Sequence, residues 1–220
     1  MRESIYTIPL NDVFTQRDGC PICRMRSMLE NRCIEYIMGA AMMEPDIRTE
    51  TNRYGFCGEH LSMMLAQKNR LSLALMLETH LDELLNSYMP PSGKKGQMSP
   101  AHTCFVCREI DSAMRKLLEN TARTAGKDPA FASLLAGQPY YCFAHYEALC
   151  GAIRDTLPKK AAAPLIQSVT NSEKTYFQSL RDDVHAFTSI FDYRSTKADR
   201  ENEQIKTAVE HAVRDRKSVV

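Results

Sequence analysis

The 220-residue sequence lacks a long apolar segment and a recognisable export signal. Its longest apolar run, Leu73–Leu77, is far too short for a membrane-spanning helix, which needs about 20 residues. The first residues, Met1–Ser4, do not lead into the apolar core of a signal peptide. The sequence therefore predicts a cytoplasmic protein that has no membrane partner.

A marked excess of charge is also missing, because the formal net charge is only +1. Proteins that bind nucleic acids usually carry a clear basic excess, so the charge argues against a nucleic-acid partner. The sequence does not exclude a protein partner, and it does not fix the oligomeric state. No acid–base pair or activated nucleophile stands out, so the sequence leans against an enzyme.

Runs of alternating β-branched residues are absent, and no glycine occurs after Gly151. The segments between the ten prolines are rich in good helix formers, which predicts an all-α fold. Helices are expected at 21–41, from 57, at 70–88, 104–124, 129–136, from 142 and at 164–193. Residues 44–54 are expected to form a loop. The helix from residue 70 has a wide apolar face, which predicts a central position.

Six of the eight cysteines fall into pairs that repeat along the chain. Each copy has a C-x2-C pair followed by a C-x2-H pair, with 33 residues (24–56) between the inner ligands in the first copy and 34 (108–141) in the second. An arginine follows each C-x2-C pair, and an aromatic residue precedes each C-x2-H pair. A period of about 85 residues with matching detail predicts an internal duplication.

The duplication predicts two related helical units, at 1–92 and 101–194, and a charged, peripheral tail at 195–220 that is helical if it is ordered. Residues 89–100, which contain two adjacent prolines and two glycines, are the expected linker. The long helices near 70–89 and 164–193 are expected to pack together in one compact body.

Thiolates and imidazoles at this spacing predict two zinc ions per chain. Residues three apart on the first helical turn can offer two ligands to one ion, and the helix dipole favours thiolate there. The expected ligands of the first site are Cys20, Cys23, Cys57 and His60, and those of the second are Cys104, Cys107, Cys142 and His145. Three cysteines and one histidine form a closed set, as in structural zinc sites. Arg24 and Arg108 are placed to offset the negative charge of the two sets.

These cysteines and histidines also admit other interpretations. The two matched copies argue against chance pairing of core thiols. A thioredoxin-type C-x2-C motif occurs in a βαβ unit, and the sequence shows none. An iron–sulfur cluster remains an alternative cofactor. Cys33 and Cys150 lie on apolar helical stripes and are expected to be buried thiols. Single histidines are expected to be structural or solvated; they are His80, His102, His185 and His211.

The paired C-P-x-C and aromatic-C-x2-H motifs, their repeat, and Phe191-Asp192-Tyr193-Arg194 resemble a family of uncharacterised bacterial proteins found mainly in Firmicutes, a domain of unknown function. The second copy departs from the motif, with Phe105 in place of proline. The resemblance would cover residues 5–215. It implies an intracellular bacterial protein with two such sites and supplies no reaction.

Together these observations predict a non-catalytic zinc-binding protein that acts as a scaffold or partner-binding module. One alternative is a thiol/zinc switch, because thiolates are the form that oxidants attack and their oxidation releases zinc. The other alternative is a zinc-module regulator that binds nucleic acid, which the near-neutral charge disfavours.

Overall fold

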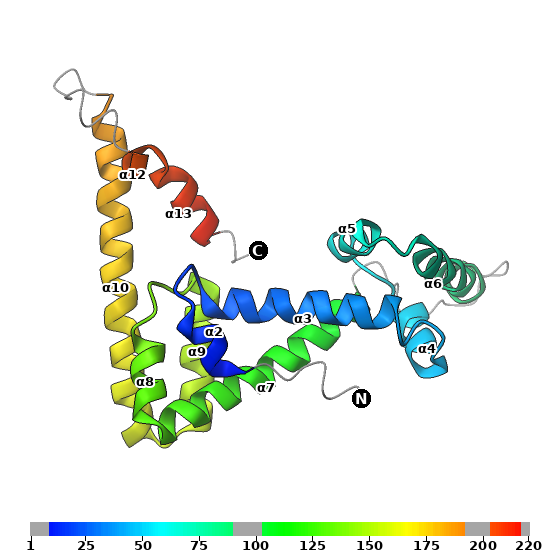
Figure 1. Cartoon of the computed structure of the whole chain (residues 1–220), viewed down its shortest axis with the longest axis horizontal. Coiled ribbons are helices and arrows are strands. Elements are labelled where there is room, and N and C mark those ends of the chain that lie inside the picture. The colour runs from blue at the N-terminus through cyan, green and yellow to red at the C-terminus, as the bar shows by residue number, and fades with distance from the viewer. Residues whose placement is uncertain (1–8, 90–102, 192–202, 217–220) are drawn as a thin grey trace. The chain divides into compact units, whose positions relative to one another are not determined.

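The computed structural model describes residues 9–89, 103–191 and 203–216 (Figure 1). These residues form helices and connecting turns with no β-strand, which confirms the all-α prediction. The first half contains α2 (Leu10–Thr15), α3 (Pro21–Met38), α4 (Pro45–Tyr54), α5 (Gly58–Ala66), α6 (Arg70–Glu83) and the π-helical turn η1 (Leu84–Tyr88). The second half contains α7 (Phe105–Lys127), α8 (Pro129–Ala136), α9 (Phe143–Thr156), α10 (Lys159–Ser189), α12 (Glu203–Lys206) and α13 (Ala208–Arg216).

The order of helices repeats between the two halves, as the duplication predicts. In each half a long helix follows the C-x2-C pair, a short helix comes next, and a third helix follows the cysteine of the C-x2-H pair. The short helices α4 and α8 both begin at a proline. Proline at the first position costs no hydrogen bond, because the N–H there has no partner within the helix.

The expectation of a loop at 44–54 is wrong, because these residues form α4. The segment is polar, but Ile47 and Thr51 lie one turn apart on one face and are buried. On the same helix, Arg48 donates hydrogen bonds from Nη2 to the carbonyl of Leu75 and to Oγ1 of Thr79, both at 2.6 Å. The helix α4 packs against α6, and the hydrogen bonds of the partly buried Arg48 join the two helices.

The prediction of a central position for the helix from residue 70 is also wrong, because most of its apolar face is exposed. Only Ser72, Leu73 and Met76 are buried on α6, whereas Leu71 and Leu81 are 68% and 55% exposed. The sequence shows apolar residues on most sides of this helix, but α6 packs mainly through one narrow face, against α4 and α5. Composition alone does not reveal which of several apolar faces finds a partner.

Two neighbouring leucines on α6 test this assignment of faces. We expect Leu73→Ala to lower the free energy of unfolding by about 2–5 kcal/mol, because the substitution leaves a cavity at a side chain that is 6% exposed. Leu71→Ala is the matched control and should change the free energy by less than about 0.5 kcal/mol, as expected for an exposed site. Urea denaturation of both variants measures the difference, and equal losses would contradict the assignment.

The chain divides into two compact units that do not coincide with its two halves. Unit 1 lies within residues 26–114 and holds most of α3, all of α4, α5 and α6, and the first part of α7. Unit 2 lies within residues 8–25 and 115–220 and holds α2, the start of α3, the rest of α7, and the helices from α8 onward. The two long helices expected to pack together, α6 and α10, belong to different units.

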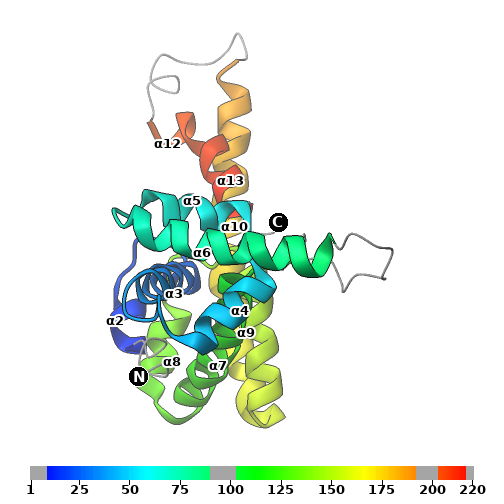
Figure 2. The same ribbon diagram turned by 90° about the vertical axis from the view of Figure 1, so that its right-hand side faces the viewer.

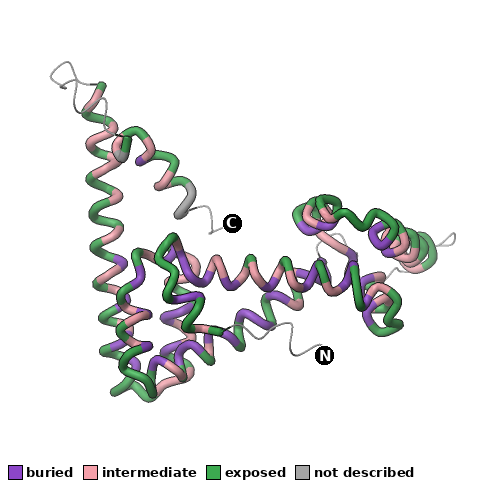
Figure 3. The backbone as a smooth tube through the Cα atoms, viewed as in Figure 1, coloured by how far each residue is buried: buried purple, intermediate pink, exposed green. Residues whose placement is uncertain are grey.

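Unit 2 is built around α10, which contacts α8, α9, α12 and α13 (Figure 2). Its fully buried residues, Ala162, Leu165, Val169 and Glu173, all lie in its N-terminal half, as the burial colours show (Figure 3). The helix begins at Lys159, five residues before the predicted start at Pro164. A proline this near the N-terminus removes only one helical hydrogen bond, so it does not end the helix.

The C-terminal tail is helical at α12 and α13, and it is less peripheral than predicted. Ala208 at the start of α13 is only 1% exposed, and α13 packs on α10. Other predictions lie outside the described residues: His102, most of the linker at 89–100, and Asp192–Arg194. Among the described helices, none is both long and apolar enough to cross a membrane.

Candidate metal centres

All eight predicted ligands gather into two clusters, but the predicted partners are wrong. One cluster combines Cys57 and His60 with Cys104 and Cys107, and we call it the α5 site. The other combines Cys142 and His145 with Cys20 and Cys23, and we call it the α9 site. Each C-x2-C pair therefore joins the C-x2-H pair of the other repeat, and each site lies within a single unit.

Helix lengths explain why the pairs cross over. At 1.5 Å per residue, the 18 residues of α3 span about 27 Å, and the 10 residues of α4 span only about 15 Å. The helix α4 alone is therefore too short to carry the chain back to the start of α3, where Cys20 lies, and Cys57 instead lies in the cluster with Cys104 and Cys107. In the second copy the difference between the two helix lengths is larger, because α7 spans about 35 Å and α8 spans about 12 Å.

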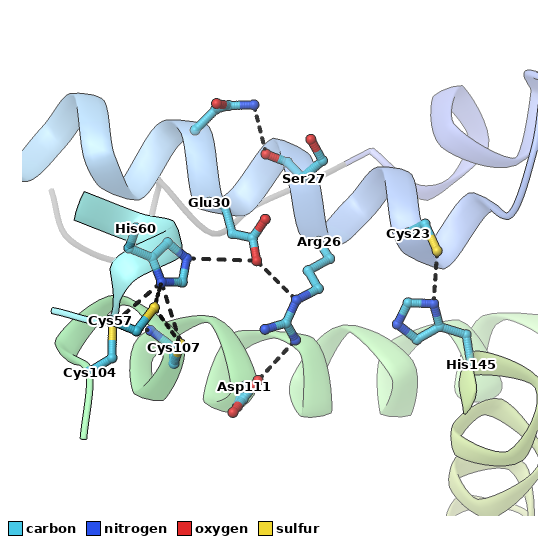
Figure 4. A network of polar contacts seen from close by, with 11 residues as sticks. Cys23, Arg26, Ser27, Glu30, Cys57, His60, Cys104, Cys107, Asp111 and His145 are labelled. Carbon is cyan, nitrogen blue, oxygen red and sulfur yellow. Dashed lines mark hydrogen bonds and ion pairs between the residues drawn. The ribbon is translucent and has the colours of Figure 1, made fainter. Parts of the chain in front are cut away.

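In the α5 site the His60 imidazole faces three sulfur atoms through Nδ1 (Figure 4). The distances from Nδ1 are 3.1 Å to Sγ of Cys57 and 3.4 Å to Sγ of both Cys104 and Cys107. The Sγ atoms of Cys57 and Cys107 are 3.9 Å apart. His60 is 3% exposed, so its ring is enclosed by protein.

The α9 site has the same arrangement. His145 again uses Nδ1, which lies 3.0 Å from Sγ of Cys142, 3.2 Å from Sγ of Cys23 and 3.7 Å from Sγ of Cys20. The sulfur atoms of Cys23 and Cys142 are 3.6 Å apart. Cys20 and Cys142 are buried, whereas Cys23 and His145 are partly exposed.

These distances fit a tetrahedral zinc ion. With Zn–S near 2.3 Å and Zn–N near 2.05 Å, tetrahedral geometry places two sulfurs about 3.8 Å apart and a sulfur and a nitrogen about 3.6 Å apart. In each cluster the ligand atoms lie within 4.8 Å of one another, and their separations lie close to these values. None of the eight cysteines is in a disulfide, so all six ligand cysteines are available as thiolates.

A glycine and two backbone contacts align the parts of the α5 site. Gly55 ends α4 with φ of 59°, and a Cβ at this position would lie 2.7 Å from the His80 ring. The carbonyl of Gly55 accepts a hydrogen bond from the N–H of Phe105 at 2.9 Å, and Oγ1 of Thr103 donates to the carbonyl of Tyr54 at 2.8 Å. The segment before Cys57 is thereby fixed beside the segment that carries Cys104.

Side chains of unit 2 align the α9 site. The N–H of Tyr141, just before Cys142, donates to Oε2 of the buried Glu173 at 2.9 Å. On the other side, Nη1 of Arg24 donates to the carbonyl of Val13 at 2.7 Å, and its guanidinium pairs with Asp18. These contacts fix the turns that lead into α9 and α3.

The two arginines predicted to offset the thiolate charge both bind other groups. Arg24 holds the turn before α3, as described above. Arg108 lies over the ring of Tyr54, 3.9 Å from its centroid, and pairs with Glu50 at 3.2 Å. The repeated arginine therefore fixes local structure in both copies.

Each site lies at the N-termini of two helices. Cys57 and Cys142 are the N-caps of α5 and α9, and Cys20 and Cys104 directly precede α3 and α7. The positive ends of the helix dipoles favour negative charge, so two helices support the thiolates of each site.

Within each cluster, the neighbouring sulfur atoms raise the pKa of the imidazole. Burial lowers the pKa of His60, but its contacts with the Cys104 sulfur and with Glu30 outweigh burial and raise that pKa to about 10. Burial likewise lowers the pKa of His145, and its contacts with Cys142 and Cys23 raise it to about 9. A bound cation would replace these protons, because a metal ligand must be neutral imidazole or thiolate.

One polar network at the α5 site could not be predicted from ligand spacing (Figure 4). Oε1 of Glu30 lies 3.8 Å from Nε2 of His60, on the side of the ring away from the sulfurs. Nε of Arg26 donates to the same oxygen at 2.9 Å, and Nη1 of Arg26 donates to Oδ1 of Asp111 at 3.0 Å. The sequence shows an Arg26–Glu30 pair at i,i+4, but nothing in it places this pair beside a histidine 30 residues later.

The remaining thiols and histidines behave largely as predicted. Cys33 and Cys150 are each 1% exposed and belong to neither cluster, which confirms them as core thiols. His80 has a structural role, because its Nδ1 lies 2.8 Å from the carbonyl of Asn52 and its ring packs against Gly55. His185 is exposed and His211 is partly exposed on their helices.

A family model described as a family of unknown function, DUF6062, matches residues 1–99 and again residues 92–219. The chain belongs to this family. The two DUF6062 matches divide the chain where the order of helices repeats, which supports the duplication. No curated protein and no solved structure matches the chain. Because DUF6062 is a family of unknown function, the residues of the two sites carry the functional argument.

Proposed function

We propose that this protein binds two zinc ions in closed, structural sites and serves as a non-catalytic scaffold or partner-binding module. The observation that carries the proposal is the pair of clusters, each with three sulfurs and one imidazole nitrogen at tetrahedral spacing. A set of four protein ligands leaves no position for a reacting water, which favours a structural role for the metal. Zinc is preferred over other metals because of its affinity for thiolate with imidazole.

Metal analysis of the purified protein tests this proposal. We expect two zinc ions per chain in the wild type, and about one in Cys57→Ser or His145→Ala, each with lower stability. Exposed His185→Ala is the matched control and should keep both ions. Iron with inorganic sulfide, or no bound metal after purification without chelators, would contradict the proposal.

A groove in unit 2 supports the partner-binding part. It lies between α9 and α10, has a volume of about 560 Å³, and is lined by Phe143, Tyr146, Phe177, Lys174 and Arg181, among others. Phe143 and Phe177 are 43% and 37% exposed, and their ring centroids lie 6.5 Å apart. Aromatic side chains and arginine, here Phe143, Phe177 and Arg181, are enriched at surfaces that bind other proteins.

A thiol/zinc switch is the second candidate, and the partial exposure of one cysteine favours it. The sulfurs of Cys23 and Cys142 lie 3.6 Å apart, and Cys23 is partly exposed. Hydrogen peroxide would accept two electrons from the two thiolates and two protons from solvent, so that its O–O bond breaks to give two molecules of water while a Cys23–Cys142 disulfide forms and the metal loses two ligands. Peroxide treatment with a chromogenic zinc chelator measures the release, and no release at modest peroxide would exclude the switch.

A further inference from the structure

The two sites differ in what supports the histidine. In the α5 site the carboxylate of Glu30 faces Nε2 of His60, and Arg26 holds that carboxylate at 2.9 Å. Asp111 holds Arg26 in turn, at 3.0 Å. A ligand histidine whose second nitrogen faces a fixed carboxylate has a set ring orientation and a stronger donor nitrogen.

The α9 site has no such support among the residues that the structure describes. No carboxylate oxygen there lies within the 4.0 Å ion-pair distance of the His145 imidazole, and this histidine is more exposed than His60. The repeat shows the same difference in sequence. Glu30 stands seven residues after Cys23, and the residue seven after Cys107 is Met114, whose side chain carries no carboxylate to accept a hydrogen bond from imidazole.

We propose that the two sites have different tasks: the α5 site retains its metal, and the α9 site exchanges its metal with the surroundings. Glu30 is the positioning residue that makes the difference. It acts through His60 and touches no metal itself. At a distance of 3.8 Å, its carboxylate interacts with the N–H dipole of the imidazole directly or through a bridging water. This inference rests on the proposed function, because it requires metal in both sites.

Chelator competition on the full chain loaded with two zinc ions tests the inference. We expect biphasic release, with one ion leaving fast and one slowly. Cys142→Ser, which retains only the α5 site, should show the slow phase alone, and Cys57→Ser should show the fast phase alone. The slow phase of Glu30→Gln should accelerate by about 10–100-fold, as found when outer partners of ligand histidines are removed.

Glu35→Gln is the matched control, since Glu35 is an exposed carboxylate on the same helix, and its release should equal that of the wild type. If Glu30→Gln does not fold, the rates of Cys142→Ser and Cys57→Ser still decide the question. Equal rates in those two variants, or a slow phase that Glu30→Gln leaves unchanged, would overturn the inference and leave the proposed function intact. A wild-type chain that takes up no zinc would instead overturn the proposed function.

Discussion

The double variant Cys23→Ser/Cys57→Ser is expected to lose both zinc ions, whereas Cys23→Ser/Cys142→Ser should lose only one. The reason is that Cys23 shares a cluster with Cys142, and Cys57 shares one with Cys104 and Cys107. Pairing within each repeat would give the opposite result, because Cys23 and Cys57 would then belong to one site. Zinc content per chain, measured on the two purified double variants, distinguishes the arrangements.

Both double variants change two cysteines to serine, so each serves as the control for the other. Loss of both ions from both variants would indicate that the sites depend on each other for folding. In that case the single variants Cys23→Ser and Cys142→Ser should be compared by metal titration. The crossed pairing would be wrong if Cys23→Ser/Cys57→Ser retained one ion.

The second large effect is expected when the repeats are separated. As a monomer, a chain of residues 1–92 or 101–220 carries two ligands for each of two sites and cannot complete either. Structural zinc sites contribute about 10–16 kcal/mol of apparent binding free energy at neutral pH, so each monomeric half should lose most of its metal affinity and much of its helical structure. Mixing the two halves should restore two zinc ions per pair.

Circular dichroism and zinc titration of each half, alone and mixed, measure this effect. A single half could also complete sites by pairing with a second copy of itself, so sedimentation must accompany the titration at each concentration. A monomeric half that binds one zinc ion as tightly as the intact chain would contradict the crossed sites. An equimolar mixture with Cys57→Ser in the first half is the control, and it should recover one ion.

Much of the fold and the identity of the ligands could be predicted from the sequence, because both depend on local patterns. Periodic apolar residues located α3, and a proline marked the start of α8. The pairing of ligands could not be predicted by counting residues, because the 33 residues include a long helix and a shorter one, and the positions of these helices decide which pairs meet. The mistaken loop at 44–54 hid this constraint.

The outer contact of Glu30 shows a second limit. Its link to His60 depends on how α3 and α5 pack within unit 1, and no local spacing encodes such a packing. The prediction of a central position for α6 is wrong for the same reason. An apolar face on a helix does not show which neighbour covers it until the neighbouring helices are placed.

The crossed ligands also fix an order in which the sites can be completed during synthesis on the ribosome. One site is nested inside the other in sequence, because the α5 site needs residues 57–107 and the α9 site needs residues 20–145. The inner site can close once Cys107 has left the exit tunnel. Cys20 and Cys23 must wait until His145 emerges, 122 residues after Cys23, which takes about 6–24 seconds at about 5–20 residues per second. The first cysteines made are thus the last to be protected, so nascent chains present a reduced C-x2-C pair to stray metals and oxidants throughout that interval.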